Sequence, residues 1–168
     1  MSTEVCLRPY TRESWQVFWR GYKNDPMMDE TPYTYDPQQC DRAFELRMQD
    51  KSRRYFAIYA GAELVGNIYL KHIDWETRSA SFGIALQCDA VKGKGYGSAA
   101  IVRLISYAFE TLGLEVLLAD AVLRNTRSQH VLEKLGFVHL RDDEVFRYYE
   151  LRRPRADGGG KHVPVCVL

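Results

Sequence analysis

Val91-Lys92-Gly93-Lys94-Gly95-Tyr96-Gly97-Ser98 is the stretch that decides the fold. Its glycines alternate with lysines and a tyrosine. An alternating apolar segment precedes it and an amphipathic segment follows. A glycine-rich turn that opens a helix leaves several backbone N–H groups unpaired, and the helix dipole adds partial positive charge at the same point. The stretch therefore predicts an anion site, most often one for phosphate.

The segments on either side predict a strand before this turn and a helix after it. Residues of Ser79–Gln87 alternate between apolar and small or polar side chains. After the glycines, apolar residues recur with helical spacing up to Gly113, which predicts a core-facing helix with Gly113 as its C′ residue. Val116–Val122 is nearly all apolar and predicts a strand covered on both faces. This strand–helix–strand unit should be parallel, with a right-handed crossover.

The remaining segments complete an α/β order with a mixed sheet. Helices are predicted at 12–23, 36–50 and 125–135, strands at 4–8, 54–59, 63–71, 137–141 and 145–152, and a loop at 24–35. Residues 1–153 should form a single domain. The segment 154–168, rich in glycine and proline, is expected to be a mobile C-terminal tail.

Composition excludes several classes of protein. The chain has 168 residues and a formal net charge of +1, which favours one domain and argues against nucleic-acid binding. Its four cysteines form no CxxC pair, so a zinc site or a disulfide framework is not expected. There is no apolar run of about 18 residues and no signal-peptide pattern. We expect a soluble cytoplasmic protein with no metal, nucleic-acid or membrane partner.

Two motifs resemble those of one enzyme family. The first is Lys92-Gly93-Lys94-Gly95-Tyr96-Gly97. It is not a P-loop, since no lysine-serine pair ends it, and its G-x-G-x-G spacing is not that of a Rossmann fingerprint. The second is Asn125-Thr126-Arg127-Ser128-Gln129-His130-Val131-Leu132-Glu133-Lys134-Leu135-Gly136-Phe137. Together they resemble the GNAT superfamily of N-acetyltransferases, in the branch of ribosomal-protein N-terminal and spermidine acetyltransferases. Lys92 stands where the family usually has arginine or glutamine.

The resemblance implies a fold and a co-substrate. The fold is a mixed central β-sheet, flanked by helices, with a splayed parallel strand pair that admits the pantetheine arm of acetyl-CoA. The implied cofactor-binding residues are Ile84, Ala85, Leu86, Lys92, Gly93, Lys94, Gly95, Tyr96, Gly97, Ser98, Asn125 and Ser128. Two alternatives stay open: the lysines are solvated, and Asn125 is a simple helix cap.

The implied reaction is direct transfer of the acetyl group to a primary amine in a ternary complex. The acceptor is a small-molecule amine, a polyamine or a protein N-terminus. A backbone N–H of Ile84 is the candidate donor to the oxyanion, and Ser128 the candidate donor to the leaving thiolate. The family's usual glutamate and tyrosine are replaced by Ser81 and Leu132. This departure motivates an alternative: a non-catalytic acyl-CoA-binding module.

The acceptor site is expected in the 24–35 loop, the start of the second helix and the last hairpin. Their acidic residues would attract a cationic amine or are simply solvated; these are Asp25, Asp29, Glu30, Asp142, Asp143 and Glu144. Tyr33 and Tyr35 would wall a pocket or cover the edge of the core. Of Tyr148 and Tyr149, one should face the cleft. Relatives are often dimers, so a homodimer is possible.

Overall fold

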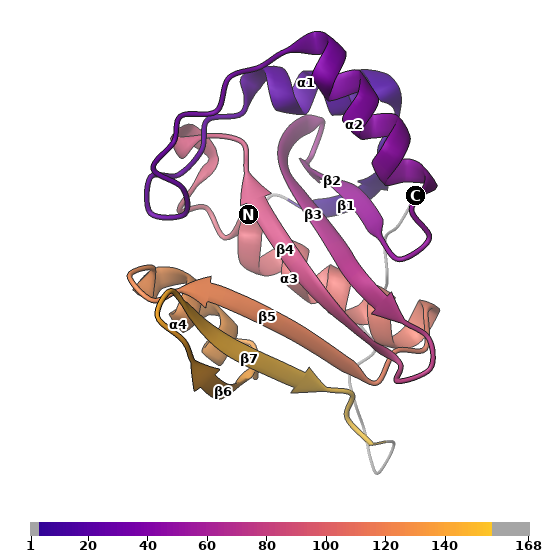
Figure 1. Cartoon of the computed structure of the whole chain (residues 1–168), viewed down its shortest axis with the longest axis vertical. Coiled ribbons are helices and arrows are strands. Elements are labelled where there is room, and N and C mark those ends of the chain that lie inside the picture. The colour runs from indigo at the N-terminus through magenta and orange to yellow at the C-terminus, as the bar shows by residue number, and fades with distance from the viewer. Residues whose placement is uncertain (1–3, 156–168) are drawn as a thin grey trace.

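The computed structural model describes residues 4–155, and these residues form one mixed sheet with helices on both faces (Figure 1). The elements in chain order are β1 (Val5–Pro9), α1 (Arg12–Gly21), α2 (Pro37–Gln49), β2 (Arg54–Ala60), β3 (Glu63–Asp74), β4 (Ser79–Leu86), the 3₁₀ helix η1 (Asp89–Val91), α3 (Tyr96–Ser106), the π-helix η2 (Tyr107–Thr111), β5 (Val116–Val122), α4 (Thr126–Lys134), β6 (Val138–Asp142) and β7 (Phe146–Arg152). Most of the predicted tail lies outside the described residues.

The sheet has the strand order β1-β2-β3-β4-β5-β7-β6, and β4 and β5 are its parallel pair. Their pairing is short. It runs from Ser79↔Val116 to Ser81↔Leu118 and then stops. Beyond this vertex the two strands diverge, which Figure 1 shows as a widening gap between the β4 and β5 ribbons. The predicted mixed sheet with a splayed parallel pair is confirmed.

The helices cover the two faces of the sheet unequally. α3 packs on β1, β3 and β4 from one side, while α1 contacts β3 and α2 contacts β2 from the other. On the α1–α2 side no helix of the described chain stands over β5 and β7 (Figure 1). The larger core lies between the sheet and α3 and α4, and an aromatic cluster around Trp15 and Phe18 lies under α1. Half of one sheet face is therefore left open.

Local sequence signals explain where α1 and α2 begin. The Thr11 side chain accepts a hydrogen bond from the backbone N–H of Ser14, and the Thr11 backbone N–H donates to the Ser14 hydroxyl, forming a capping box. Asp36 caps α2 through the N–H groups of Gln38 and Gln39, with proline in the first turn. These caps fix the two ends of the loop between the helices, which later borders the site.

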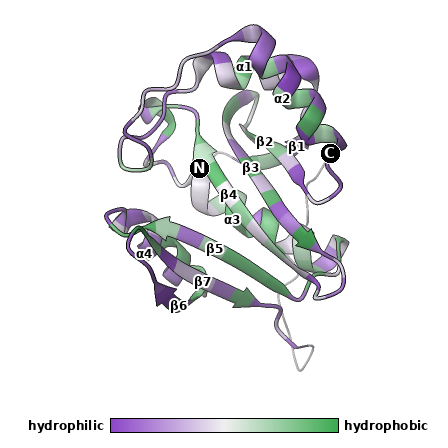
Figure 2. Cartoon of the chain, viewed as in Figure 1, coloured by the Kyte–Doolittle hydropathy of each residue, from purple (hydrophilic) through white to green (hydrophobic). Residues whose placement is uncertain are grey.

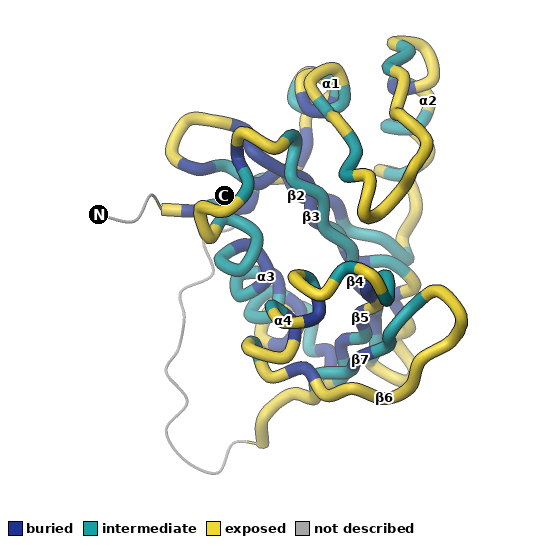
Figure 3. Tube along the Cα trace, turned by 90° about the vertical axis from the view of Figure 1, so that its left-hand side faces the viewer, coloured by how far each residue is buried: buried dark blue, intermediate teal, exposed yellow. Residues whose placement is uncertain are grey.

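The prediction that β5 is covered on both faces is wrong. Leu117, Ala119 and Ala121 are buried, but Asp120 between them is exposed. Apolar composition alone does not say what covers a strand, and the single acid marks the open face. Figure 2 shows the same contrast as a break in the hydrophobic colour of β5. Edge strand β6 is exposed along its whole length (Figure 3).

Candidate functional site

A cleft of about 330 Å³ lies where β4 and β5 separate. Its walls come from β3, β4, the glycine-rich turn, α3, β5, α4 and the α1–α2 loop. The lining residues are Tyr22, Asp25, Met28, Tyr69, Lys71, Phe82, Gly83, Ile84, Ala85, Leu86, Lys92, Gly93, Gly95, Tyr96, Gly97, Ser98, Ile101, Ala119, Asp120, Asn125, Arg127, Ser128, Val131 and Leu132. Every predicted cofactor-binding residue is among them except Lys94, which is exposed.

The glycine-rich turn adopts a backbone that side chains disfavour. Gly93 has φ +74° and Gly95 has φ +81°, both in the left-handed region. A Cβ at Gly95 would meet nothing within 4 Å, so glycine is required there by conformation and not by space. Gly95 is the N-cap of α3 and offers no side chain to the first-turn N–H groups. These donors remain available for an anion at the floor of the cleft.

The edge of β4 that faces the cleft is available for hydrogen bonds. Its residues pair with β3 on the other side, for example Ile84 with Ile68 and Leu86 with Gly66. Toward β5 the pairing ends at Ser81. An extended polar chain lying in the gap could therefore pair with the backbone of Gly83 to Leu86, as an added strand would.

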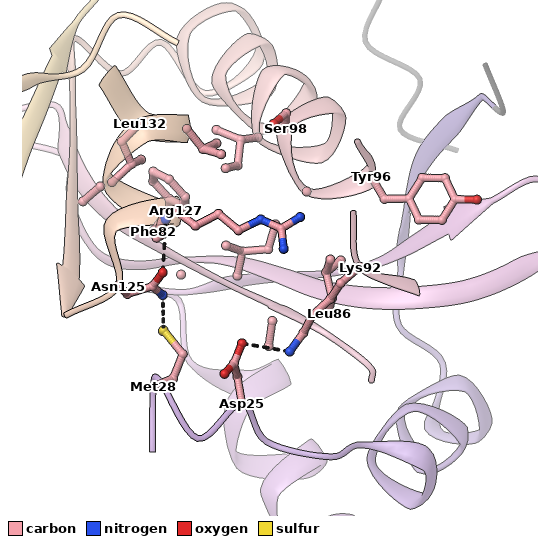
Figure 4. Close-up of a pocket in the computed structure, with 18 of the residues that line it drawn as sticks. Asp25, Met28, Phe82, Leu86, Lys92, Tyr96, Ser98, Asn125, Arg127 and Leu132 are labelled. Atoms are coloured by element: carbon pink, nitrogen blue, oxygen red, sulfur yellow. Dashed lines mark hydrogen bonds and ion pairs between the residues drawn. The ribbon is translucent and has the colours of Figure 1, made fainter. Parts of the chain in front are cut away.

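Asn125 acts as the cap of α4. Its Oδ1 accepts the backbone N–H of Ser128 at 3.1 Å, and its Nδ2 lies 3.1 Å from the sulfur of Met28 (Figure 4). The helix-cap alternative is thus correct, and a contact with pantetheine stays a prediction. The Ser128 hydroxyl makes no hydrogen bond within residues 4–155 and lines the cleft.

Two cations border the glycine-rich turn, and sequence reasoning identified one of them. The Lys92 ammonium lies 2.8 Å from Asp25 and 2.8 Å from Asp89. Burial lowers the pKa of Lys92, but the hydrogen bonds to these two carboxylates outweigh it and leave the pKa raised. Arg127, which was missed, reaches from α4 toward the turn: its Nη2 lies 3.6 Å from the position of a Cβ at Gly93 (Figure 4).

Arg127 makes no ion pair with any residue between 4 and 155, in contrast to Lys92. The second motif leaves its position variable, so the motif gave no signal for it. An Arg in the first turn of a helix that follows a strand end was the available clue. Its guanidinium and the unpaired N–H groups at the start of α3 converge on the same space. Such a set of donors suits a diphosphate better than a single lysine would.

The comparison with protein families decides what this arrangement is. The family model described as "Acetyltransferase (GNAT) domain" matches residues 4–138. The chain belongs to the GNAT acetyltransferase family. The predicted N-acetyltransferase is confirmed at the level of this family, and the match spans both motifs.

Curated relatives of this acetyltransferase are distant. It is 33% identical over 113 residues to the putative ribosomal N-acetyltransferase YdaF of Bacillus subtilis, a match that covers 63% of this chain and 61% of the relative. It is 25% identical over 135 residues to acetyltransferase PseH of Campylobacter jejuni, which covers 80% and 82% of the two chains. The name of neither relative identifies the acceptor of this protein.

Solved structures share the fold of this acetyltransferase. The dodecameric spermidine N-acetyltransferase of Vibrio cholerae superposes with a TM-score of 0.73 at 22% identity, over 90% of this chain and 95% of that one. A chimera of the same enzyme with hSSAT gives a TM-score of 0.78 at 22% identity, over 88% and 95%. At this identity the likeness establishes the GNAT fold and leaves the substrate open.

The acidic residues predicted for the acceptor site of the acetyltransferase are mostly used in its own structure. Asp25 pairs with Lys92, and Glu30 with Arg124. Asp142 accepts from Arg147 and His139, and the Arg147 hydrogen bond is the main reason that its pKa falls to about 2. These three acids are thus neither simply solvated nor free, and their attraction of a cationic amine stays a prediction.

The aromatic residues of the acceptor region divide between core and cleft side. Tyr33 packs on Trp19 and Tyr22, so it covers the edge of the core. Tyr149 is fully buried and donates to Glu133 at 3.0 Å. Tyr148 is the tyrosine on the open side: its hydroxyl donates to Asp143 at 2.6 Å.

The acid–base half of the acetyltransferase site contains groups that the motifs did not predict. Leu132, at the position where the resemblance implied a tyrosine, is buried and lines the cleft, whereas Ser81 does not line it. Asp120 of β5 and Tyr69 of β3 do line it. The acid within the apolar β5 segment was the sequence signal for Asp120. Tyr69 gave none, because an aromatic residue in a strand usually packs in the core.

Residues 4–155 contain no group of three or more histidine, cysteine or acidic side chains placed to hold a metal ion. None of their helices has the length and apolar character needed to cross a membrane. Cys40 and Cys88 form no disulfide within residues 4–155, and Cys88 does not line the cleft.

Proposed function

We propose that this acetyltransferase binds acetyl-CoA in the cleft and transfers the acetyl group directly to a primary amine in a ternary complex. The observation that carries the proposal is the early end of the β4–β5 pairing at Ser81↔Leu118, which opens a cleft that also reaches the uncapped start of α3. A chain with a diphosphate at one end and amide groups along its length matches the donors and acceptors of this gap. Acetyl-CoA is such a molecule.

The proposed binding mode follows from the direction of the cleft. The first-turn N–H groups of α3 and the Arg127 guanidinium would hold the diphosphate, with Lys92 as a further cation. Pantetheine would then run along the unpaired edge of Ile84 to Leu86. The thioester would lie toward the strand vertex, beside Gly83 and β5.

The proposed chemistry uses groups of the chain at that end. The amine nitrogen attacks the thioester carbonyl after losing one proton, and the backbone N–H of Ile84 donates to the oxyanion. The C–S bond then breaks. The Ser128 hydroxyl, which is free of other hydrogen bonds within the described chain, donates to the thiolate and is reprotonated from the new amide nitrogen.

The experiment is a turnover assay with a panel of amines: polyamines, amino acids, aminoglycosides and peptides with a free N-terminus. Release of free CoA thiol, together with the N-acetylated product by mass spectrometry, is the expected result. CoA that binds to the protein, with no thiol released for any amine, would instead identify a non-catalytic acyl-CoA-binding module. That outcome would overturn the proposal.

We also propose three properties that the sequence predicts: a single domain over residues 1–153, a cytoplasmic location and a homodimer. The family match to residues 4–138 supports the extent of the unit. The dodecameric spermidine N-acetyltransferase of Vibrio cholerae supports self-association in this fold. Light scattering after size exclusion would measure the number of subunits, and a monomer at assay concentration would contradict self-association.

A further inference from the structure

Asp120 lies on a part of the sheet that no helix of residues 4–155 covers. Its pairing partner in β7 is Tyr148, and paired residues point to the same face. That face also carries Leu118, which pairs with Ser81, which in turn pairs with Lys71 of β3. Farther along the same face, Tyr69 packs with the α1–α2 cluster. The Asp120 carboxylate therefore lies on the open half of the α1–α2 side, where an acceptor can enter.

The strand register brings Asp120 to the end of the cleft where β4 and β5 meet. The last β4–β5 pair is Ser81↔Leu118, and two residues farther on, the strands present Gly83 and Asp120. Both of these residues line the cleft. A thioester carried along the β4 edge reaches this vertex last, so Asp120 stands beside the place where the carbonyl carbon would be attacked.

Tyr69 defines a wall of the same space. A Cβ at Gly83 would collide with the Tyr69 hydroxyl, so the glycine allows the phenol to lie across β4 at the vertex. The ring is held by stacking on Tyr55, with centroids 5.0 Å apart. Burial chiefly raises the pKa of Tyr69, followed by Tyr55, and the Asp120 carboxylate also contributes. Tyr69 and Asp120 are thus electrostatic neighbours, with the phenol neutral at neutral pH.

Asp120 differs from the other acid of the cleft. The Asp25 carboxylate is paired with Lys92 at 2.8 Å. Asp120 makes no ion pair or hydrogen bond with any residue in 4–155, and Lys71, the nearby cation of the same face, is not paired with it. An exposed acid without a partner keeps its full capacity to bind a cation. Closure of the site by acceptor and thioester would remove water and strengthen that attraction.

We propose that Asp120 binds the ammonium group of a cationic alkylamine acceptor and takes the proton that the nitrogen must lose. This inference rests on the proposed function. One N–H bond of the ammonium breaks and its proton moves to an Asp120 oxygen. The nitrogen lone pair then forms the C–N bond, and the C–S electrons leave with sulfur. The second N–H proton reaches the thiolate through Ser128, and Asp120 returns its proton to solvent. In this role the Asp120 carboxylate takes the place of the family's usual glutamate, whose position is occupied by Ser81 in this chain.

The test compares Asp120→Asn with Glu150→Gln. Glu150 lies on the same face, opposite Leu118, but is paired with Arg152 at 3.0 Å and lies outside the cleft lining. With the best cationic amine of the panel, Asp120→Asn should lower kcat/KM by about 10²-fold or more, the usual scale for one acid–base group. The KM for acetyl-CoA and the melting temperature should not change. Glu150→Gln should match the wild type.

A neutral aromatic amine gives the second readout. It has no cation to bind and no ammonium proton to lose at neutral pH, so Asp120→Asn should affect its kcat/KM far less than that of the alkylamine. Equal losses for both amines, or an unchanged alkylamine rate, would overturn the role of Asp120.

A binding measurement separates this inference from the proposed function. The alkylamines are titrated calorimetrically into wild-type and Asp120→Asn protein saturated with CoA, which cannot react. Weaker binding to the variant supports the ammonium site even where no amine turns over. Equal affinities, or no binding to the wild type, overturn it.

Discussion

At the scale of single residues, Ser128 carries the most specific catalytic expectation. Its hydroxyl lines the cleft, while its backbone N–H, and not its side chain, makes the bond to the Asn125 cap. Ser128→Ala therefore leaves the α4 cap intact and removes the donor to the thiolate. We expect kcat at saturating acetyl-CoA to fall by about 10²-fold. The KM for acetyl-CoA should change little. An unchanged kcat would eliminate the role.

Arg127 carries the corresponding expectation for the diphosphate. Within the described chain its guanidinium is unpaired, and it lies over Gly93. Arg127→Ala should raise the KM for acetyl-CoA by about 10- to 100-fold, since one charge-assisted contact is worth roughly 1.5–3 kcal/mol, and should leave kcat nearly constant. Lys134→Ala removes an exposed cation from the other end of α4 and is the matched control. If both variants raise KM equally, the effect is one of overall charge.

At the scale of elements, two glycines of the glycine-rich turn meet different requirements. Gly95 is needed for the backbone conformation, and Gly97 for the space that the ligand would occupy. Gly95 has a left-handed φ, so Gly95→Ala should destabilise the fold by about 1–2 kcal/mol. Gly97 has room for a methyl group, since its Cβ would lie 3.9 Å from Ile84 Cδ1. Gly97→Ala should keep the melting temperature and still raise the KM for acetyl-CoA.

Thermal unfolding and steady-state kinetics of the two variants check this contrast. A stable Gly95→Ala protein would show that the left-handed turn is not needed. A Gly97→Ala protein with an unchanged KM would show that the diphosphate does not approach the backbone at this position.

Helices and strands could be predicted from the sequence where a residue pattern is compatible with one local structure only. Alternation in Ser79–Gln87, the Asp36-Pro37 cap and Gly113 each gave an element close to the observed bounds. The coverage of β5 was not predictable, because it depends on how far α1 and α2 extend over the sheet. The same extent of α1 and α2 leaves the Asp120 side chain exposed to solvent. The π-helical end of α3, η2, likewise had no sequence signal.

The glycine-rich turn was predictable because glycines mark where backbone must be exposed, and in the proposed binding mode it is backbone N–H groups that hold the diphosphate. Arg127, Tyr69 and Asp120 were not, since each reaches the cleft from a different element. Only the register of β3 with β4 and of β4 with β5 brings the latter two together. The acidic residues of the loops can be read from the sequence, but the ion pairs that they form within the fold cannot.

At the scale of the whole molecule, the α1–α2 loop joins the two halves that border the cleft. Asp25 holds Lys92 at the glycine-rich turn, Met28 contacts Asn125, and Glu30 pairs with Arg124 at 3.1 Å. The loop thus fastens the helical layer of α1 and α2 to α4 and the start of α3. One of its fastenings uses a cation that the diphosphate would also attract, so folding contacts and ligand contacts compete for Lys92.

This competition gives the last prediction. Asp25→Asn removes a negative charge 2.8 Å from the Lys92 ammonium and leaves the loop length unchanged. The Kd for CoA should fall by roughly two- to fivefold at low salt, and the gain should shrink at high salt because partly exposed charges are screened. Calorimetric titration at two salt concentrations measures both effects. The Lys92 hydrogen bond lowers the pKa of Asp25, so the pair is complete at neutral pH and is lost only as pH falls below that pKa.

Glu30→Gln is the matched control for this variant. It removes the same charge from the same loop, but the Glu30 carboxylate is bound to Arg124 and not to Lys92. Its Kd for CoA should stay close to the wild-type value. Tighter binding by both variants would mean that the net charge of the loop acts at a distance. Weaker binding by Asp25→Asn would mean that Asp25 positions Lys92 for the diphosphate, and that the loop completes the site instead of competing with its ligand.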